Sequence, residues 1–211
     1  MATRRRVLTP TLQLLVLLPI AAAYLWMGLL AGRGLSGDEP HYLAITQSLW
    51  LYHTLDQSRV LLHHDFFSYY HSLMSSHSLH RDGRLYPLHP LALPVLLLPG
   101  FAVAGARGAR FMVALLAVLL CWRMLRLTAR VVAPRPAALT VLGVGLSAPF
   151  VLNAGAIYPD VASGLVIVLA YEAIDAPRLT ARRALALGLL LALAPWLHIK
   201  LLVIVGAYML W

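Results

Sequence analysis

The sequence predicts an all-α fold: a polytopic bundle of about five or six transmembrane helices, with interfacial helices in a periplasmic first loop. Three observations support this prediction. Hydrophobic residues make up 61% of the chain and charged residues only 12%, a balance that is not typical of a soluble domain. Apolar runs long enough to cross a bilayer recur along the chain. Arginines gather in alternate loops between these runs, as the positive-inside rule requires.

The first apolar run covers about residues 10–31 and follows three arginines at positions 4–6. A signal peptide has a similar layout, and the alanines at 21–23 resemble a cleavage site. However, the run continues for about 20 residues, which is enough to span a membrane. We therefore expect an uncleaved first span, with its basic start in the cytoplasm and the next loop outside.

The external loop covers about residues 32–109 and contains eight of the nine histidines. Apolar residues at helical spacing predict an amphipathic interfacial helix over about 40–55, with Pro40 tolerated in its first turn. A second apolar run, about 90–104, contains Pro94 and Pro99 and is short for a span. We expect an interfacial or re-entrant helix there.

In the rest of the chain, apolar runs predict spans at about 110–128, 137–153 and 160–175. We expect one membrane domain that covers residues 1–211. The last segment, about 184–211, is either one kinked helix or two short helices broken at Pro195-Trp196. We favour two helices, because His198 and Lys200 are costly at mid-bilayer depth. Glu172 should be solvated at the cytoplasmic end of its span. Because the sequence ends within an apolar run, we expect a missing C-terminal half or a partner subunit.

Three acids carry the strongest functional signal. Asp38 and Glu39 follow the first span, and Asp160 precedes the fourth, so the predicted topology brings all three to the outer face. Carboxylates beside membrane helices are costly and are often functional. They predict a shared acidic site that could also hold a divalent metal ion. The alternative is that each acid only caps a helix.

Histidines and outer cations suggest further sites. The loop histidines with Asp65 offer zinc-type ligands, but their spacing matches no fixed metal motif, so they can equally be exposed loop residues. The histidines concerned are His63, His64, His71, His77, His80 and His89. Arg84, Arg110 and Lys200 could bind either a phosphate or lipid headgroups. The net charge of +9 does not predict nucleic-acid binding, because most arginines lie beside apolar segments. Cys121, the single cysteine, should be a packing residue.

The segment that follows the first span resembles the acidic motif of C-type integral-membrane glycosyltransferases. Its sequence is Gly37-Asp38-Glu39-Pro40-His41-Tyr42. This group includes protein O-mannosyltransferases and aminoarabinose transferases of lipid A. The segment 83–94 is similar to the family's loop before its second span, and 105–110 resembles the junction into that span. Asp160 matches the second external-loop acid, and 195–198 resembles bacterial members. The resemblance covers most of the chain in short patches.

The resemblance implies transfer of a sugar from a polyprenyl-phosphate donor, with inversion, at the periplasmic face of the inner membrane. Asp38 would be the base that deprotonates the acceptor, or would orient it. Glu39 and Asp160 would position donor, acceptor or a divalent ion. Substrate-binding residues would be Tyr42, Arg84, Tyr86, His89, Tyr158, His198 and Lys200.

Two other function classes stay open at this point. A non-catalytic membrane scaffold or lipid-binding subunit would use the external loop as an interaction surface. A transporter is less well supported, because the spans carry almost no interior polar residues to line a route.

Overall fold

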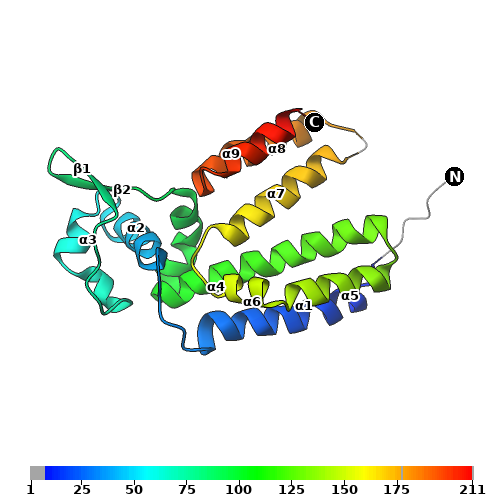
Figure 1. Ribbon diagram of the computed structural model, residues 1–211, viewed down its shortest axis with the longest axis horizontal. Helices are drawn as coiled ribbons and strands as arrows, with labels where there is room; N and C mark the ends of the chain where they lie inside the picture. Colours follow the sequence, from blue (N-terminus) through cyan, green and yellow to red (C-terminus); the bar gives the residue numbers. More distant parts are fainter. Residues whose placement is uncertain (1–7, 177, 211) are drawn as a thin grey trace.

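The computed structural model describes residues 8–176 and 178–210 of the chain. The arginines at 4–6 and Trp211, the last residue of the segment expected at 184–211, lie outside the described residues. The elements run in the order α1 (Pro10–Leu25), η1 (Trp26–Leu30), α2 (Glu39–Tyr52), α3 (Ser58–Leu62), η2 (Asp65–Ser68), β1 (Ser78–Arg81), β2 (Arg84–Pro87), α4 (Ala92–Val131), α5 (Pro134–Gly145), α6 (Ala148–Ala154), α7 (Asp160–Ile174), α8 (Ala181–Leu197) and α9 (Leu201–Leu210). The long helices lie alongside one another, and α2, α3 and the strands gather at one end (Figure 1).

Two helical segments are long and apolar enough to cross a membrane: residues 10–30, which join α1 to the π-helical η1, and α4. A third is available if the bent pair α5 and α6 forms one span. The prediction of five or six spans is therefore wrong for the described residues. Helix α7 has 15 residues, α8 has 17 and α9 has 10. At about 1.5 Å per residue each is shorter than the roughly 30 Å hydrocarbon core.

Helix α4 folds back on itself near its first third. Ala104 and Gly105 leave the helical conformation, with φ of −143° and +56°. Gly100, before this turn, and Gly108, after it, lie backbone against backbone, and a Cβ at either position would overlap the other residue. The turn separates two helical halves at the junction that the sequence analysis places between the 90–104 helix and the following span.

Two further expected spans are interrupted. The segment expected at 137–153 forms α5 and α6, which are bent by 63° at a short break. Pro149 lies in the first turn of α6, where a proline fits without losing a helical hydrogen bond. In the last segment Pro195 stays inside α8, and the interruption follows at residues 198–200, where His198 is extended. That segment therefore forms two short helices, broken slightly later than Pro195-Trp196.

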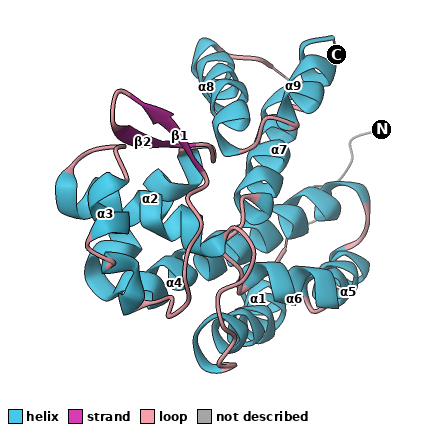
Figure 2. Ribbon diagram, turned by 60° about the vertical axis from the view of Figure 1, so that its left-hand side comes forward, coloured by secondary structure: helices cyan, strands magenta, loops and turns pink. Residues whose placement is uncertain are grey.

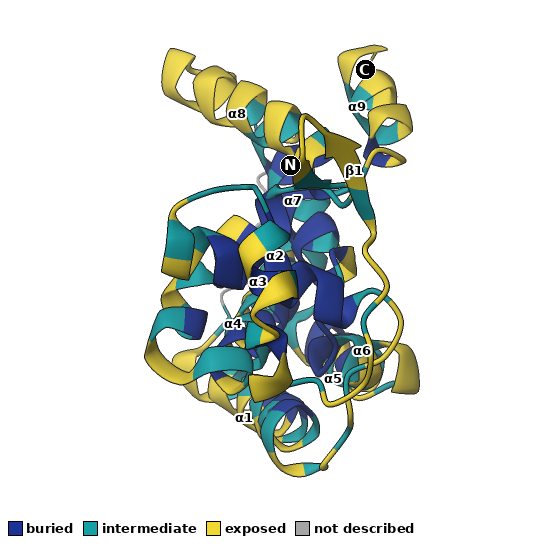
Figure 3. Cartoon of the chain, turned by 90° about the vertical axis from the view of Figure 1, so that its left-hand side faces the viewer, coloured by how far each residue is buried: buried dark blue, intermediate teal, exposed yellow. Residues whose placement is uncertain are grey.

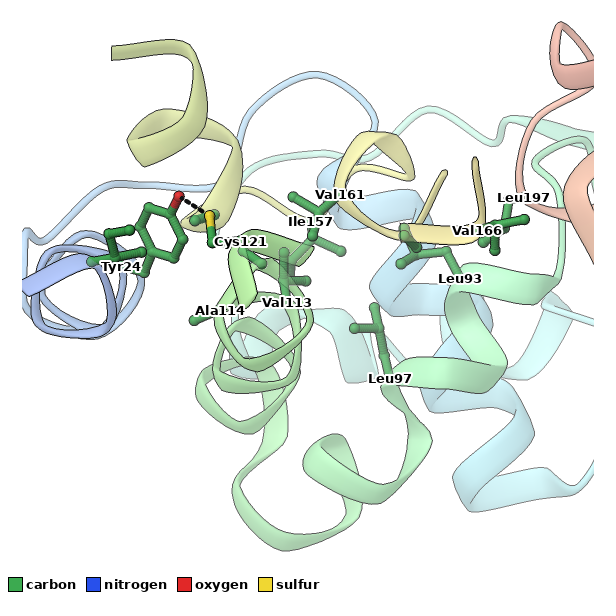
Figure 4. Close-up of a cluster of buried hydrophobic side chains, with 14 of the residues drawn as sticks. Tyr24, Leu93, Leu97, Val113, Ala114, Cys121, Ile157, Val161, Val166 and Leu197 are labelled. Atoms are coloured by element: carbon green, nitrogen blue, oxygen red, sulfur yellow. Dashed lines mark hydrogen bonds between the residues drawn. The ribbon is translucent and has the colours of Figure 1, made fainter. Parts of the chain in front are cut away.

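The core runs along α4, which contacts α1, α2, α5, α7 and α8. Aliphatic side chains from these helices pack together in the interior (Figure 4). Tyr24 of α1 donates a hydrogen bond to the Gly145 carbonyl at 2.9 Å, and its oxygen lies 3.2 Å from Cys121 Sγ. Cys121 is fully buried, so it packs inside the protein.

The region between the first two candidate spans differs from the prediction in two ways. Helix α2 was expected to lie amphipathically at the membrane interface, but all residues from Glu39 to Ser48 are buried (Figure 3). Several of its polar side chains bond internally: Ser48 Oγ donates to the carbonyls of Thr54 and Asp56, and Gln47 Nε2 donates to the carbonyl of Asp65. The all-α prediction also missed the antiparallel hairpin of β1 and β2 (Figure 2).

At the opposite end of the bundle, the prediction for Glu172 is wrong. It was expected to be solvated, but its side chain is 5% exposed. It accepts hydrogen bonds from Arg123 and Arg130 of α4, and Arg130 also pairs with Asp175 at 3.1 Å. A buried carboxylate is tolerated here because two guanidinium groups neutralise its charge.

Candidate functional site

The first part of the site is the loop that enters α2. Gly37 has a φ of +57°, and a Cβ there would overlap the Tyr158 hydroxyl. That hydroxyl donates to the Ser36 carbonyl at 2.9 Å and accepts from the Asp38 backbone N–H at 3.2 Å. Tyr158 lies two residues before Asp160, so one side chain ties the first acidic motif to the second.

Glu39 has a different environment from its neighbour Asp38. Its side chain is fully buried and pairs with Arg33 at 2.5 Å. It also accepts backbone hydrogen bonds from Ser36 at 3.0 Å and from Ile157 at 2.8 Å. Both carboxylate oxygens are thus engaged by the protein. This geometry lets Glu39 position the entry to α2 and leaves no free oxygen for a substrate or an ion.

The hairpin brings two histidines together at its base. Strand pairing joins Ser78 to Pro87, and the Leu88 N–H donates to the His77 carbonyl at 3.2 Å. His77 immediately precedes β1 and His89 follows β2 by two residues. Antiparallel register therefore places them side by side, with His77 Nδ1 3.3 Å from His89 Nε2.

Asp38 completes this group. Its Oδ1 lies 3.7 Å from His77 Nδ1, and both side chains are 46% exposed. One ligand atom from each of Asp38, His77 and His89 lies within 4.8 Å of the others, a grouping that could hold a metal ion. The sequence-based metal set was Asp38, Glu39 and Asp160, so the partners of Asp38 in this group are different residues.

Two residues of α2 support the histidine rings. His41 stacks on His77 with ring centres 3.9 Å apart, and Tyr42 lies 4.9 Å from His89. Burial, helped by the neighbouring histidines His77 and His89, lowers the pKa of His41 to about 4. The pKa of His89 is also lowered, mainly by burial. Both rings are therefore neutral at pH 7, the form in which imidazole binds metals.

Asp160 is exposed at the start of α7 and faces the same region. Burial raises the pKa of Tyr42 to about 12, and the charges of Asp38 and Asp160 add to that increase. Both acids therefore contribute negative charge to the surroundings of the Tyr42 hydroxyl. The structure brings Asp38, Asp160, Tyr42, His89 and Tyr158 into one neighbourhood.

Four predicted substrate-binding residues lie elsewhere: Arg84, Tyr86, His198 and Lys200. Arg84 is exposed on the hairpin beside Tyr86 and Asp56, and these neighbours raise its pKa. His198 accepts from the Lys200 backbone N–H at 3.1 Å at the α8–α9 junction. Within residues 8–176 and 178–210, no hydrogen bond or ion pair links Arg84, His198 or Lys200 to the acids.

An apolar cavity of about 640 Å³ lies where η1 meets the fold of α4. Arg107 is its one charged lining residue. The lining residues are Leu29, Leu30, Pro99, Gly100, Val103, Ala104, Arg107, Gly108, Phe111 and Met112. Nearby, the Nε and Nη2 atoms of Arg110 are buried and lack a hydrogen-bond partner among the described residues. The combination suits an apolar chain with an anionic end.

Comparison with family models, with curated proteins and with solved structures finds no match to this chain. The site therefore rests on its own geometry. Sequence reasoning missed His41 as a supporting residue and did not single out His77. The sequence feature that could have identified His77 is Asp82-Gly83, because an Asp-Gly pair is typical of a two-residue hairpin turn. A hairpin with this turn pairs the segments that carry His77 and His89. In the structure both turn residues have positive φ.

Proposed function

We propose that this chain is a membrane glycosyltransferase, or part of one, that moves a sugar from a polyprenyl-phosphate donor to an acceptor at the outer face of the inner membrane. One observation carries the proposal: Asp38 and Asp160 are two accessible carboxylates, distant in sequence, and Tyr158, two residues before Asp160, hydrogen-bonds to the loop that carries Asp38. In this proposal the arginines at 4–6 lie in the cytoplasm and the acids face the periplasm.

The chemistry needs one base and one stabilised leaving group. A carboxylate takes the proton of the acceptor hydroxyl while the oxygen of that hydroxyl forms a bond to the anomeric carbon. The bond from that carbon to the phosphate oxygen breaks with inversion, and polyprenyl phosphate leaves. Asp38 and Asp160 are the candidate bases. Arg107 is placed to stabilise the phosphate charge, since arginine matches phosphate oxygens with paired N–H groups.

The apolar cavity supports a lipid-linked donor over a water-soluble one. Its walls are mostly aliphatic, and it lies beside the end of the first candidate span. A polyprenyl chain could pass from the bilayer into this cavity without exposing its apolar surface to water, and in this proposal Arg107 meets the phosphate. A nucleotide sugar would leave most of this surface without a partner.

The test is transfer of labelled sugar from polyprenyl-phosphate donors by the full chain in membrane vesicles. Asp38→Asn and Asp160→Asn should each reduce transfer at least about 100-fold if the carboxylate acts as base or orients the acceptor. Asp82→Asn, at the exposed hairpin tip, is the matched control and should keep full activity. Wild-type vesicles without transfer across a panel of donor sugars, or unchanged activity in both variants, would sink the proposal.

A second experiment tests the cavity alone. A photo-crosslinking polyprenyl phosphate should label the wild-type chain near Val103, and Val103→Trp should reduce labelling by filling the cavity. Leu139→Trp, on the exposed side of α5, adds the same side chain away from the cavity and should label normally. Equal labelling of both variants would place the lipid elsewhere.

One observation favours a non-catalytic scaffold instead. Leu73, Leu79 and Leu88 in the external region are 87%, 56% and 65% exposed, and exposed apolar side chains are common at docking surfaces. If function is lost when these leucines become serine, yet survives Asp38→Asn and Asp160→Asn, the scaffold is the better explanation.

A further inference from the structure

We propose that Asp38, His77 and His89 form a binding site for a divalent transition-metal ion, with Zn²⁺ the ion that fits best. The site joins the start of α2 to the base of the β1–β2 hairpin. It differs from the set of three acids that the sequence suggests, and it stands on geometry that does not depend on the proposed transferase activity.

The distances are close to those that zinc requires. Zinc bonds nitrogen and oxygen at about 2.0–2.1 Å, so tetrahedral ligands lie roughly 3.3–3.4 Å apart. His77 Nδ1 and His89 Nε2 are 3.3 Å apart, and His77 Nδ1 and Asp38 Oδ1 are 3.7 Å apart. All three ligand atoms lie within 4.8 Å of one another. A rotation of the half-exposed Asp38 side chain closes the remaining gap.

The supports of the ligands are already in place. Strand register holds His77 opposite the residues that lead to His89, and the Leu88–His77 backbone hydrogen bond closes the hairpin base. His41 and Tyr42 pack against the two imidazole rings from α2. Metal sites bind best when neighbouring groups fix the ligand rings before the ion arrives.

The ligand types select the class of ion. Two imidazole nitrogens and one carboxylate suit zinc and related first-row ions, whereas Mg²⁺ and Ca²⁺ prefer sites made of oxygen. Three protein ligands leave one zinc position open for water or for an oxygen of a substrate. If Asp38 holds the ion, Asp160 is left as the base; this assignment rests on the proposed function.

The simplest competing explanation is an ion pair. In that case His77 and Asp38 only pair with each other, with Nδ1 and Oδ1 3.7 Å apart. The two explanations differ in a measurable way, because an ion pair takes up a proton while the proposed site takes up one metal ion per chain.

The test uses the full chain, purified in detergent, stripped with a chelator and titrated with Zn²⁺ by calorimetry. We expect one Zn²⁺ bound per chain. His77→Ala and His89→Ala should each weaken binding at least about tenfold, since each removes one of three ligands. His80→Ala is the matched control, because His80 lies on β1 of the same hairpin and is exposed. It should bind Zn²⁺ as the wild type does.

Absence of stoichiometric uptake would overturn the proposal and leave the ion pair. So would an equal loss in His80→Ala, or unchanged binding in both ligand variants. If either alanine variant fails gel filtration, His77→Gln and His89→Gln replace it, and the visible absorption of bound Co²⁺ reports the ligand loss in the folded protein. No sugar is needed, so a chain that binds zinc but transfers nothing keeps the site and refutes only the transferase proposal.

Discussion

Mutation of the adjacent acids Asp38 and Glu39 should change the free energy of unfolding to very different extents. Glu39→Ala should have the larger effect. The change removes the ion pair to Arg33 and leaves the Ile157 and Ser36 backbone N–H groups without their acceptor. Breaking a buried ion pair typically costs about 3–5 kcal/mol. The Arg33 side chain is 27% exposed, so water recovers part of that loss.

An orphaned buried N–H group adds about 1–3 kcal/mol. We therefore expect Glu39→Ala to lower the free energy of unfolding by about 3–5 kcal/mol. Glu39→Gln keeps an oxygen for the Ile157 N–H but loses the charge, and should cost about 1–3 kcal/mol. Asp38→Asn should change stability by less than about 0.5 kcal/mol in metal-free buffer, because its carboxylate is half exposed.

The assay is unfolding in detergent with chelator present, followed by tryptophan fluorescence and by circular dichroism. The order of stability should be wild type and Asp38→Asn together, then Glu39→Gln, then Glu39→Ala. If Glu39→Ala stays within about 1 kcal/mol of wild type, or if Asp38→Asn loses as much, the division of roles between the two acids is refuted.

Three further predictions concern stability. Tyr69→Phe should stabilise the protein by about 1 kcal/mol, because the Tyr69 hydroxyl is buried without a partner among the described residues. Burial raises the pKa of Tyr69: the unfolded chain ionises above about pH 10 while the folded chain stays protonated. The free energy of unfolding of the wild type should therefore fall above that pH. In unfolding measured at alkaline pH, that of Tyr69→Phe should fall less. Glu172→Ala should cost about 3 kcal/mol in thermal unfolding by leaving Arg123 unpaired, whereas a cost near zero would mean that water solvates this end. Gly37→Ala should cost about 1–2 kcal/mol, because φ is positive and the new methyl group meets the Tyr158 hydroxyl; a Gly37→Ala, Tyr158→Phe double variant should recover part of this loss.

The sequence predicted the meeting of the two acidic motifs but not their detailed partners. Apolar run lengths and arginine clusters are properties of local sequence, and from them we expect Asp38 and Asp160 on one side of the membrane, which stays a prediction. The partners of Asp38 depend on strand register, and the four-residue strands carry no clear alternation of apolar and polar residues. Only the Asp82-Gly83 turn marked the hairpin.

The prediction for α2 failed for a related reason. Its polar residues, such as Gln47 and Ser48, look like a solvent-facing side when only spacing is considered. In the folded chain both are buried; Ser48 donates to carbonyls of the loop after α2, and Gln47 donates to the carbonyl of Asp65 at the start of η2. Periodicity cannot separate a helix that faces solvent from one whose polar groups are satisfied inside the protein. The span count failed because α7, α8 and α9 are too short to span and because α5 and α6 are bent by 63° at a short break.

The close approach of Gly100 to Gly108 has a consequence for tracing the ancestry of this chain. Any homologue that keeps the folded α4 needs a residue without a side chain at both positions, and a residue that accepts positive φ in place of Gly105 between them. Apolar positions elsewhere in the helices can exchange freely among leucine, valine and isoleucine. Two glycines eight positions apart, followed about fifty residues later by an acidic helix start, therefore form a search pattern that can outlast overall sequence similarity.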